Sequence, residues 1–166
     1  MANVTTITVP VERIEFISRK PFQQVLDGVH RGLGHPDFGQ FVRHIAQLND
    51  WEEFKAAVAA EAGPSGLMVF LELDLGGVVG KDPQAIGFRE VRIIAGNPVT
   101  MESMVRTSPA AGAFAPVTIL IFESPDGVHV RYDTLTSAVA SELSAEALVH
   151  ARKLDTSVTE LLRSAV

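Results

Sequence analysis

Hydrophobic residues recur along this chain with two different spacings, which predict where strands and helices lie. Apolar and β-branched runs predict strands over residues 9–17, 67–75, 90–95, 117–122 and 128–133. Apolar residues at helical spacing predict helices over 22–33, 50–62, 100–106 and 144–165. Residues 36–47 stay ambiguous, because their apolar spacing is helical but Gly39 disfavours a helix. Loops are predicted over 76–89 and 108–115, where Gly, Pro and Ala are frequent.

This element order predicts an α+β fold, in which helices pack on one face of a mainly antiparallel sheet. The order is β-α-β-β-β-β-α, with helical residues between the first helix and the second strand. On strand 67–75, Met68 and Phe70 are expected to share a face with Glu72 and Asp74. Met68, Phe70 and Ile94 would then form an apolar patch on the outer face. Soluble monomers rarely expose such a patch, so we expect a homodimer through this face.

Composition places the chain among soluble globular proteins and narrows its partners. The 166 residues suit one domain, and the formal net charge is −6. Neither nucleic acid nor a membrane is therefore an expected partner, since both need a concentrated basic surface. The N-terminal residues show no secretion signal, so a cytoplasmic location is expected. The absence of cysteine excludes disulfides and thiolate chemistry.

Residues 93–137 carry a set of short motifs that together identify a family. They are Gly96-Asn97-Pro98, Met104, Ala115-Pro116, an apolar strand, an Asp-Gly turn and Tyr132-Asp133. Phe22 after Lys20-Pro21, and Leu154-Asp155, complete the set. With these motifs the chain resembles the DUF302 (TT1751-like) family over most of its length. It departs from the family at residues 134–137, where relatives often carry a Pro-Ser-Ser-like run.

The resemblance implies a fold related to the TATA-binding-protein architecture, often found as dimers. It also implies a single domain over residues 1–166, with residues 36–66 as a helical insertion that a longer subgroup carries. It implies no catalytic residue. The Thr-Leu-Thr-Ser run at 134–137 puts the shape of any ligand site at that corner in question.

Six residues are candidates for a ligand site: Asn97, Met101, Met104, Phe114, Tyr132 and Asp133. Asn97 would line a pocket with its amide, or would simply cap the helix that Pro98 begins. Tyr132 and Asp133 would serve in acid–base chemistry, or as a half-buried aromatic and a turn residue. The two methionines and Phe114 would line an apolar pocket, or would fill the core.

Other polar residues give weaker indications. Glu72 and Asp74 share a strand face, where they would bind a hard cation, divide acid and base roles, or pair with Arg92. The five histidines form no metal-binding spacing, and neither a metal nor a cofactor is predicted. The run 76–81 lacks the spacing of a phosphate-binding loop.

Two functions of different kinds follow. The first is a small-molecule-binding or interaction module that forms a homodimer and takes a small, partly apolar ligand. The alternative is an enzyme of small-molecule metabolism that uses Tyr132, Asp133 and Asn97 at one pocket. The geometry of these three side chains distinguishes the two, because a catalytic site needs them within hydrogen-bond reach of one cavity.

Overall fold

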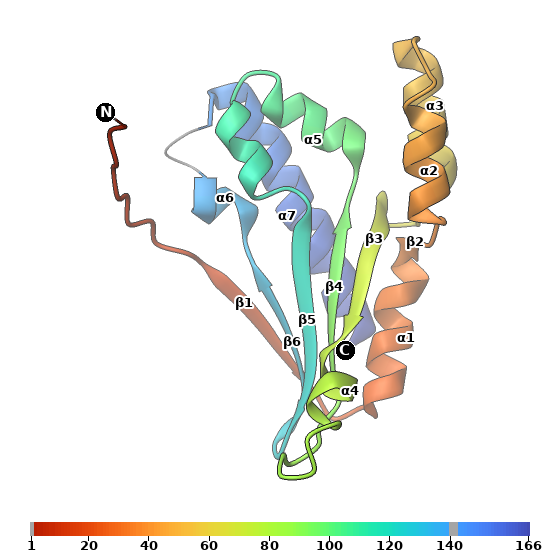
Figure 1. Ribbon diagram of the computed structural model, residues 1–166, viewed down its shortest axis with the longest axis vertical. Helices are drawn as coiled ribbons and strands as arrows, with labels where there is room; N and C mark the ends of the chain where they lie inside the picture. Colours follow the sequence, from red (N-terminus) through yellow and green to blue (C-terminus); the bar gives the residue numbers. More distant parts are fainter. Residues whose placement is uncertain (1, 140–142) are drawn as a thin grey trace.

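The computed structural model describes residues 2–139 and 143–166, and its centre is a mainly antiparallel sheet. The six strands of the described chain are β1 (Arg13–Ser18), β2 (Leu33–Gly34), β3 (Leu67–Asp74), β4 (Glu90–Gly96), β5 (Val117–Ser124) and β6 (Gly127–Asp133). Their spatial order is β1-β6-β5-β4-β3-β2, and only β2 runs parallel to its neighbour. The predicted α+β class is therefore confirmed (Figure 1).

Helices α1 (Phe22–Gly32) and α7 (Ala145–Ala165) cross one face of the sheet (Figure 1). The other helices of the described chain are α2 (Phe38–Ile45), α3 (Trp51–Glu61), α4 (Leu75–Val79), α5 (Pro98–Val105), the 3-10 helix η1 (Pro109–Ala113) and α6 (Leu135–Val139). Helices α1 and α7 pack together, and a Cβ on Gly28 would lie 2.9 Å from the Cβ of Ala165. Glycine at this position lets the two backbones approach closely.

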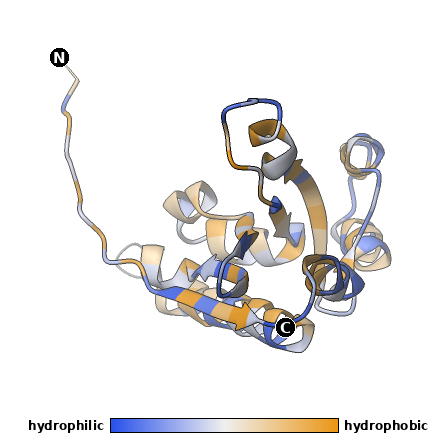
Figure 2. Cartoon of the chain, turned by 90° about the horizontal axis from the view of Figure 1, so that it is seen from below, coloured by the Kyte–Doolittle hydropathy of each residue, from blue (hydrophilic) through white to orange (hydrophobic). Residues whose placement is uncertain are grey.

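The inner face of the sheet and the helices over it form the main core. Ile93, Ile119, Ile121 and Val130 are fully buried there, as is Leu162 of α7. Strand β1 shows the underlying alternation of polar and apolar side chains (Figure 2). In β1, β5 and β6 the alternation predicted from the sequence thus places one face of the strand against the helices.

Three short elements differ from the sequence prediction. Helix α4 begins at Leu75, the last residue of the predicted strand 67–75, and continues into the predicted loop 76–89, where the Asp74 carboxylate accepts a hydrogen bond from the amide of Gly77 at 2.7 Å. Strand β2 and helix α6 add to the predicted β-α-β-β-β-β-α order. The ambiguous residues 36–47 form α2, whose N-terminus Asp37 caps.

A β-bulge in β3 makes the predicted facing of that strand wrong. Val69 lies opposite Ala95 but Leu71 lies opposite Ile94, so the extra residue between them reverses the alternation. Glu72 consequently points toward the helices, where its carboxylate lies 2.6 Å from Nε2 of His30. The predicted pairing of Glu72 with Arg92 is therefore not observed.

Helices α2 and α3 cover the end of the outer face that we expected to be exposed. Met68 is fully buried there in a second small core with Phe41 and Val58. The ring of Phe70 stacks on Phe38 with centroids 4.5 Å apart. The expectation that Met68 and Phe70 form an exposed patch is wrong; Ile94 remains half-buried on the outer face.

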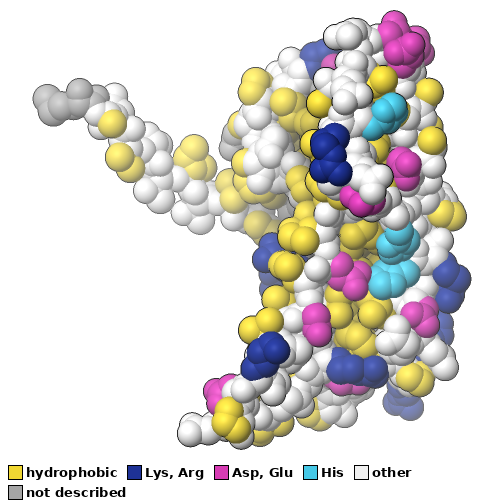
Figure 3. All heavy atoms as spheres, turned by 45° about the vertical axis from the view of Figure 1, so that its right-hand side comes forward, with side chains coloured by type: hydrophobic (Ala, Val, Ile, Leu, Met, Phe, Trp, Pro, Cys, Tyr) yellow, Lys and Arg dark blue, Asp and Glu magenta, His cyan; other side chains and the backbone are white. Residues whose placement is uncertain are grey.

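Residues 2–8 form an extended arm that stands away from the body (Figure 3). Val4 and Ile7 on this arm are 91% and 68% exposed. The predicted strand over 9–17 therefore begins only at Arg13. In the part of the chain that the structure describes, no helix has both the length and the apolar character needed to cross a membrane.

Candidate functional site

The six candidate residues lie in three different places. Asn97, Met101 and Met104 line an apolar pocket at one end of the sheet. Phe114 and Asp133 line a groove on the outer face. Tyr132 lies in the core with 1% of its surface exposed. The structure therefore brings the candidates together only as two separate subsets.

Asn97 acts as the helix cap that the sequence predicts. Its Oδ1 accepts hydrogen bonds from the amides of Val99 at 2.9 Å and Thr100 at 3.2 Å. Its Nδ2 donates to the carbonyl oxygen of Gly66 at 2.8 Å. Pro98 occupies the first helical position, where a missing amide hydrogen costs nothing. Both the oxygen and the nitrogen of the Asn97 side chain thus have backbone partners.

Tyr132 points into the helix layer, away from Asp133. Its hydroxyl donates to the carboxylate of Asp155 on α7. Burial raises the pKa of Tyr132, and the hydrogen bond to Asp155 raises it further. The same carboxylate accepts from the amides of Leu135 at 2.9 Å and Thr136 at 3.0 Å. Tyr132 therefore has a structural role, joining the end of β6 to α6 and α7.

Asp133 lies on the outer face in a bidentate ion pair. Its two oxygens lie 2.6 Å from Nε and 2.7 Å from a terminal nitrogen of Arg13. The hydrogen bonds from Arg13 hold the pKa of Asp133 below its usual value. Because Asp133, Tyr132 and Asn97 face different surroundings, the alternative of one catalytic pocket built from them is wrong.

The apolar pocket lies between α2, α5 and the segment that leads into β5. It is a cavity of about 420 Å³. Met104 is fully buried in its wall, while Met101 is 37% exposed. Phe41 and Val42 of α2 form the opposite side. Among the described lining residues, Asn97 alone has a polar side chain, so the cavity suits an apolar guest.

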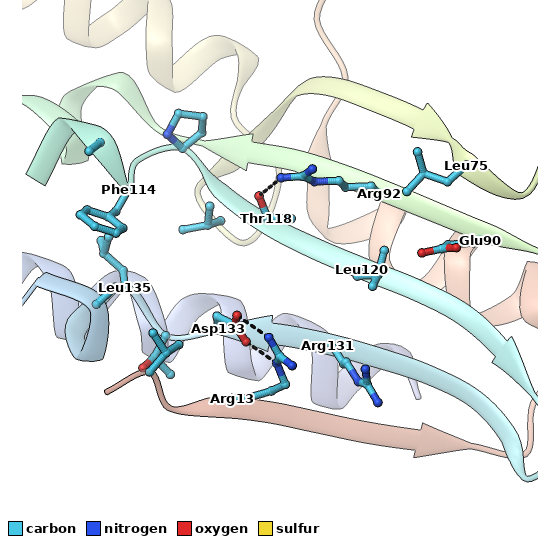
Figure 4. Close-up of a pocket in the computed structure, with 16 residues that line it drawn as sticks. Arg13, Leu75, Glu90, Arg92, Phe114, Thr118, Leu120, Arg131, Asp133 and Leu135 are labelled. Atoms are coloured by element: carbon cyan, nitrogen blue, oxygen red, sulfur yellow. Dashed lines mark hydrogen bonds and ion pairs between the residues drawn. The ribbon is translucent and has the colours of Figure 1, made fainter. Parts of the chain in front are cut away.

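The outer-face groove is larger, about 610 Å³, and its floor comes from β4, β5 and β6 (Figure 4). Arg92, Thr118 and Leu120 lie at its centre. A terminal nitrogen of Arg92 lies 3.5 Å from Oγ1 of Thr118. Within residues 2–139 and 143–166, Arg92 makes no ion pair. Among the residues that the structure describes, the groove therefore holds a cation without a carboxylate partner.

The remaining basic groups near the groove are paired. Arg13 is held by Asp133, and Arg131 by Glu15. The Arg131 guanidinium also lies 4.8 Å from the ring centroid of Phe122. Arg92 thus differs from Arg13 and Arg131 in having its charge available to a ligand.

Sequence reasoning missed a buried histidine beside this groove. His129 has Nδ1 at 2.9 Å from Glu15 and Nε2 at 2.8 Å from Asp126. The hydrogen bond to Asp126, followed by that to Glu15, raises the pKa of His129. The imidazole therefore lies between a carboxylate of the β5–β6 turn and a carboxylate of β1, and it ties the turn to that strand. The described residues form no group of three or more acidic or histidine side chains placed to hold a metal ion.

Comparisons with known proteins agree with this architecture. A family model described as "Domain of unknown function DUF302" matches residues 42–164. The crystal structure of an uncharacterized conserved protein DUF302 from Bacillus stearothermophilus is similar, with a TM-score of 0.65 over 93% of this chain and 98% of that chain. At 8% identity, that similarity concerns the fold alone. No curated protein matches the sequence. Since the family model covers well over half of the chain, this protein belongs to the DUF302 family.

Proposed function

We propose that this protein is a binding module that takes a small apolar molecule in the pocket between α2 and α5. The observation that carries the proposal is a preformed apolar cavity of about 420 Å³. Ligand sites in proteins are typically apolar concavities of roughly 300–1,000 Å³. A cavity near the lower end of that range suits a compact guest, such as a short acyl chain or a small molecule of two or three aromatic rings.

The chemistry of the walls supports binding over catalysis. The amide of Asn97 is engaged with backbone groups, and the rest of the lining is apolar. Met101 and Met104 are flexible and polarisable, so they adapt to guests of different shape. A guest would gain roughly 25 cal/mol for each Å² of apolar surface that it removes from water. The pocket would then select among guests by their size and shape.

Filling the cavity tests the proposal. A Cβ on Gly112 would meet only Val105, at 3.6 Å, so Gly112→Leu can extend a side chain into the pocket without backbone clash. We expect this variant to bind the neutral fluorophore N-phenyl-1-naphthylamine at least tenfold more weakly than the wild type, as measured by fluorescence titration. Its unfolding midpoint checks that the fold persists.

Gly87→Leu is the matched control. A Cβ at Gly87 has nothing within 4 Å, so the same side chain is added outside the pocket. Fluorophore affinity should equal that of the wild type. Failure of the wild type to bind the fluorophore, or equal affinity for both leucine variants, would contradict the proposal.

We also propose that the protein forms a homodimer through the part of the outer face that stays open. Leu71 is 48% exposed there and lies opposite the half-buried Ile94. Ile17 is also 54% exposed, but the charged groove with Arg92 lies between it and Leu71, so the proposed interface is limited to the β3 side of the face. Apolar side chains that remain exposed on a sheet face support pairing with another apolar surface.

Sedimentation equilibrium tests the dimer. We expect a dimer mass for the wild type at micromolar concentration, and Leu71→Glu should weaken dimerisation at least tenfold, since a charge would be buried without a partner. Val149→Glu is the control, because Val149 is 50% exposed on α7, away from the proposed interface. A monomeric wild type would refute the dimer.

A further inference from the structure

The apolar pocket and the outer-face groove are neighbours that share a wall. Pro116 and Val117 line both cavities. On the pocket side, this wall faces Met104 and the side chains of α2. On the groove side, the floor continues along β5 to Thr118. An elongated ligand that crosses Pro116 would therefore meet an apolar environment at one end and a polar one at the other.

Arg92 is placed to hold the polar end. Its guanidinium contacts Oγ1 of Thr118 at 3.5 Å. Alternate residues of an extended chain, such as Pro116 and Thr118, lie on the same face about 6.6 Å apart. The contact with Thr118 is therefore about that far from the shared wall. Figure 4 shows the guanidinium directed toward Thr118 and away from Glu90, the acidic residue on the same face of β4. Arg92 thus points toward the shared wall.

The guanidinium of Arg92 gives this position a local positive charge, although Glu90 lines the same groove. Asp133 neutralises Arg13, and Glu15 neutralises Arg131. A guanidinium beside a hydroxyl, with no ion-pair partner in the described part of the chain, can donate two parallel hydrogen bonds to a carboxylate. A phosphate is less suited, because one arginine leaves much of its charge unmatched and Glu90 lies in the same groove.

We propose that the ligand is an amphipathic carboxylic acid, whose apolar tail occupies the pocket and whose carboxylate binds Arg92 beside Thr118. This inference rests on the proposed binding of apolar molecules in the pocket. The wall at Pro116 sets the point where the tail ends and the head begins. Phe114, at the groove end nearest the wall, would cover the ligand between the two sites.

A pair of probes that differ only in the head group tests the inference. Octanoate and 1-octanol are titrated calorimetrically into the wild-type protein and into Arg92→Met. We expect the wild type to bind octanoate at least tenfold more tightly than octanol. Arg92→Met should reduce octanoate affinity to the octanol level and leave octanol affinity unchanged, while Arg92→Lys should retain part of the preference.

Arg31→Met on the exposed side of α1 is the control and should alter neither affinity. Gly112→Leu should weaken both probes, because it fills the site of the shared tail. Octanol binding with no preference for octanoate would overturn this inference and leave the proposed apolar pocket standing. An octanoate affinity that falls in Arg92→Met but stays unchanged in Gly112→Leu would also overturn this inference. Binding of neither probe would overturn the inference together with the proposed function.

Discussion

Replacing Asp155 with alanine is expected to lower the free energy of unfolding by about 3 kcal/mol. The carboxylate of Asp155 accepts from the Tyr132 hydroxyl and from the amides of Leu135 and Thr136. Hydrogen bonds to a charged group contribute roughly 1.5–3 kcal/mol each and are not additive. Asp155→Ala leaves all three donors without this acceptor, and it removes the cap at the start of α6.

Urea unfolding followed by circular dichroism measures this loss. Tyr132→Phe removes one of the three donors and should cost only about 1 kcal/mol. Asp27→Ala is the control, because in the described part of the chain that exposed carboxylate bonds only the Gln23 side chain, and it should change stability by less than about 0.5 kcal/mol. A loss for Asp155→Ala no larger than that for Tyr132→Phe would disprove the three-way role of this carboxylate.

The Asp155 cluster also explains two of the motifs by which the sequence resembles its family. Tyr132 and Asp155 lie 23 residues apart in the chain, yet they meet where β6 ends and α7 crosses the sheet. The residues between them turn through α6, whose first amides the carboxylate binds. This polar pair joins three elements of the structure, so its presence in the motif needs no catalytic explanation.

Features set by neighbouring residues could be predicted from the sequence. The cap at Asn97 depends on residues within three positions, and Asp50 caps α3 by accepting from the amides of Glu52 and Glu53. Capping was one of the two roles predicted for Asn97, because Pro98 follows it at the first position of a helix. The long helix α7 was predicted because its apolar stripe repeats over 21 residues.

Features set by distant residues could not be predicted. The pair of Arg13 and Asp133 joins positions 120 apart, and no local pattern indicates it. The bulge between Val69 and Leu71 is one irregularity of the backbone, but it reverses the facing of every later residue on β3. For this reason Glu72 was assigned to the wrong face.

The candidate site also combines features set by neighbouring residues with features set by distant ones. Met101 and Met104 were identified because they lie in a distinctive segment, and both line the apolar pocket. The opposite side of that pocket comes from α2, which the sequence left ambiguous. Arg92 was considered only as a partner of Glu72, since its position above the groove depends on the pairing of three strands.

Two glycines hold α2 and α3 against the sheet and thereby shape the pocket. A Cβ on Gly34 would lie 1.8 Å from the carbonyl oxygen of Glu61, at the end of α3. A Cβ on Gly63 would lie 2.2 Å from the carbonyl carbon of Leu33. Each contact is with backbone, which cannot move aside as a flexible side chain would. Any larger residue at either position must therefore push α3 away from β2.

Gly34→Ala is expected to destabilise the protein by about 3 kcal/mol, at the upper end of the cost of overpacking, and to weaken fluorophore binding at least tenfold. Displacing α3 disturbs α2, whose Phe41 and Val42 line the pocket. Urea unfolding measures the first effect and fluorescence titration the second.

Hydrogen exchange should show lost protection over 36–66 with β4, β5 and β6 unchanged, because those strands pair independently of β2. Gly87→Ala, where a Cβ meets open space, is the control and should match the wild type. A Gly34→Ala protein with wild-type stability and affinity would show that the α2–α3 segment is free to shift, and that its contact with β2 does not shape the pocket.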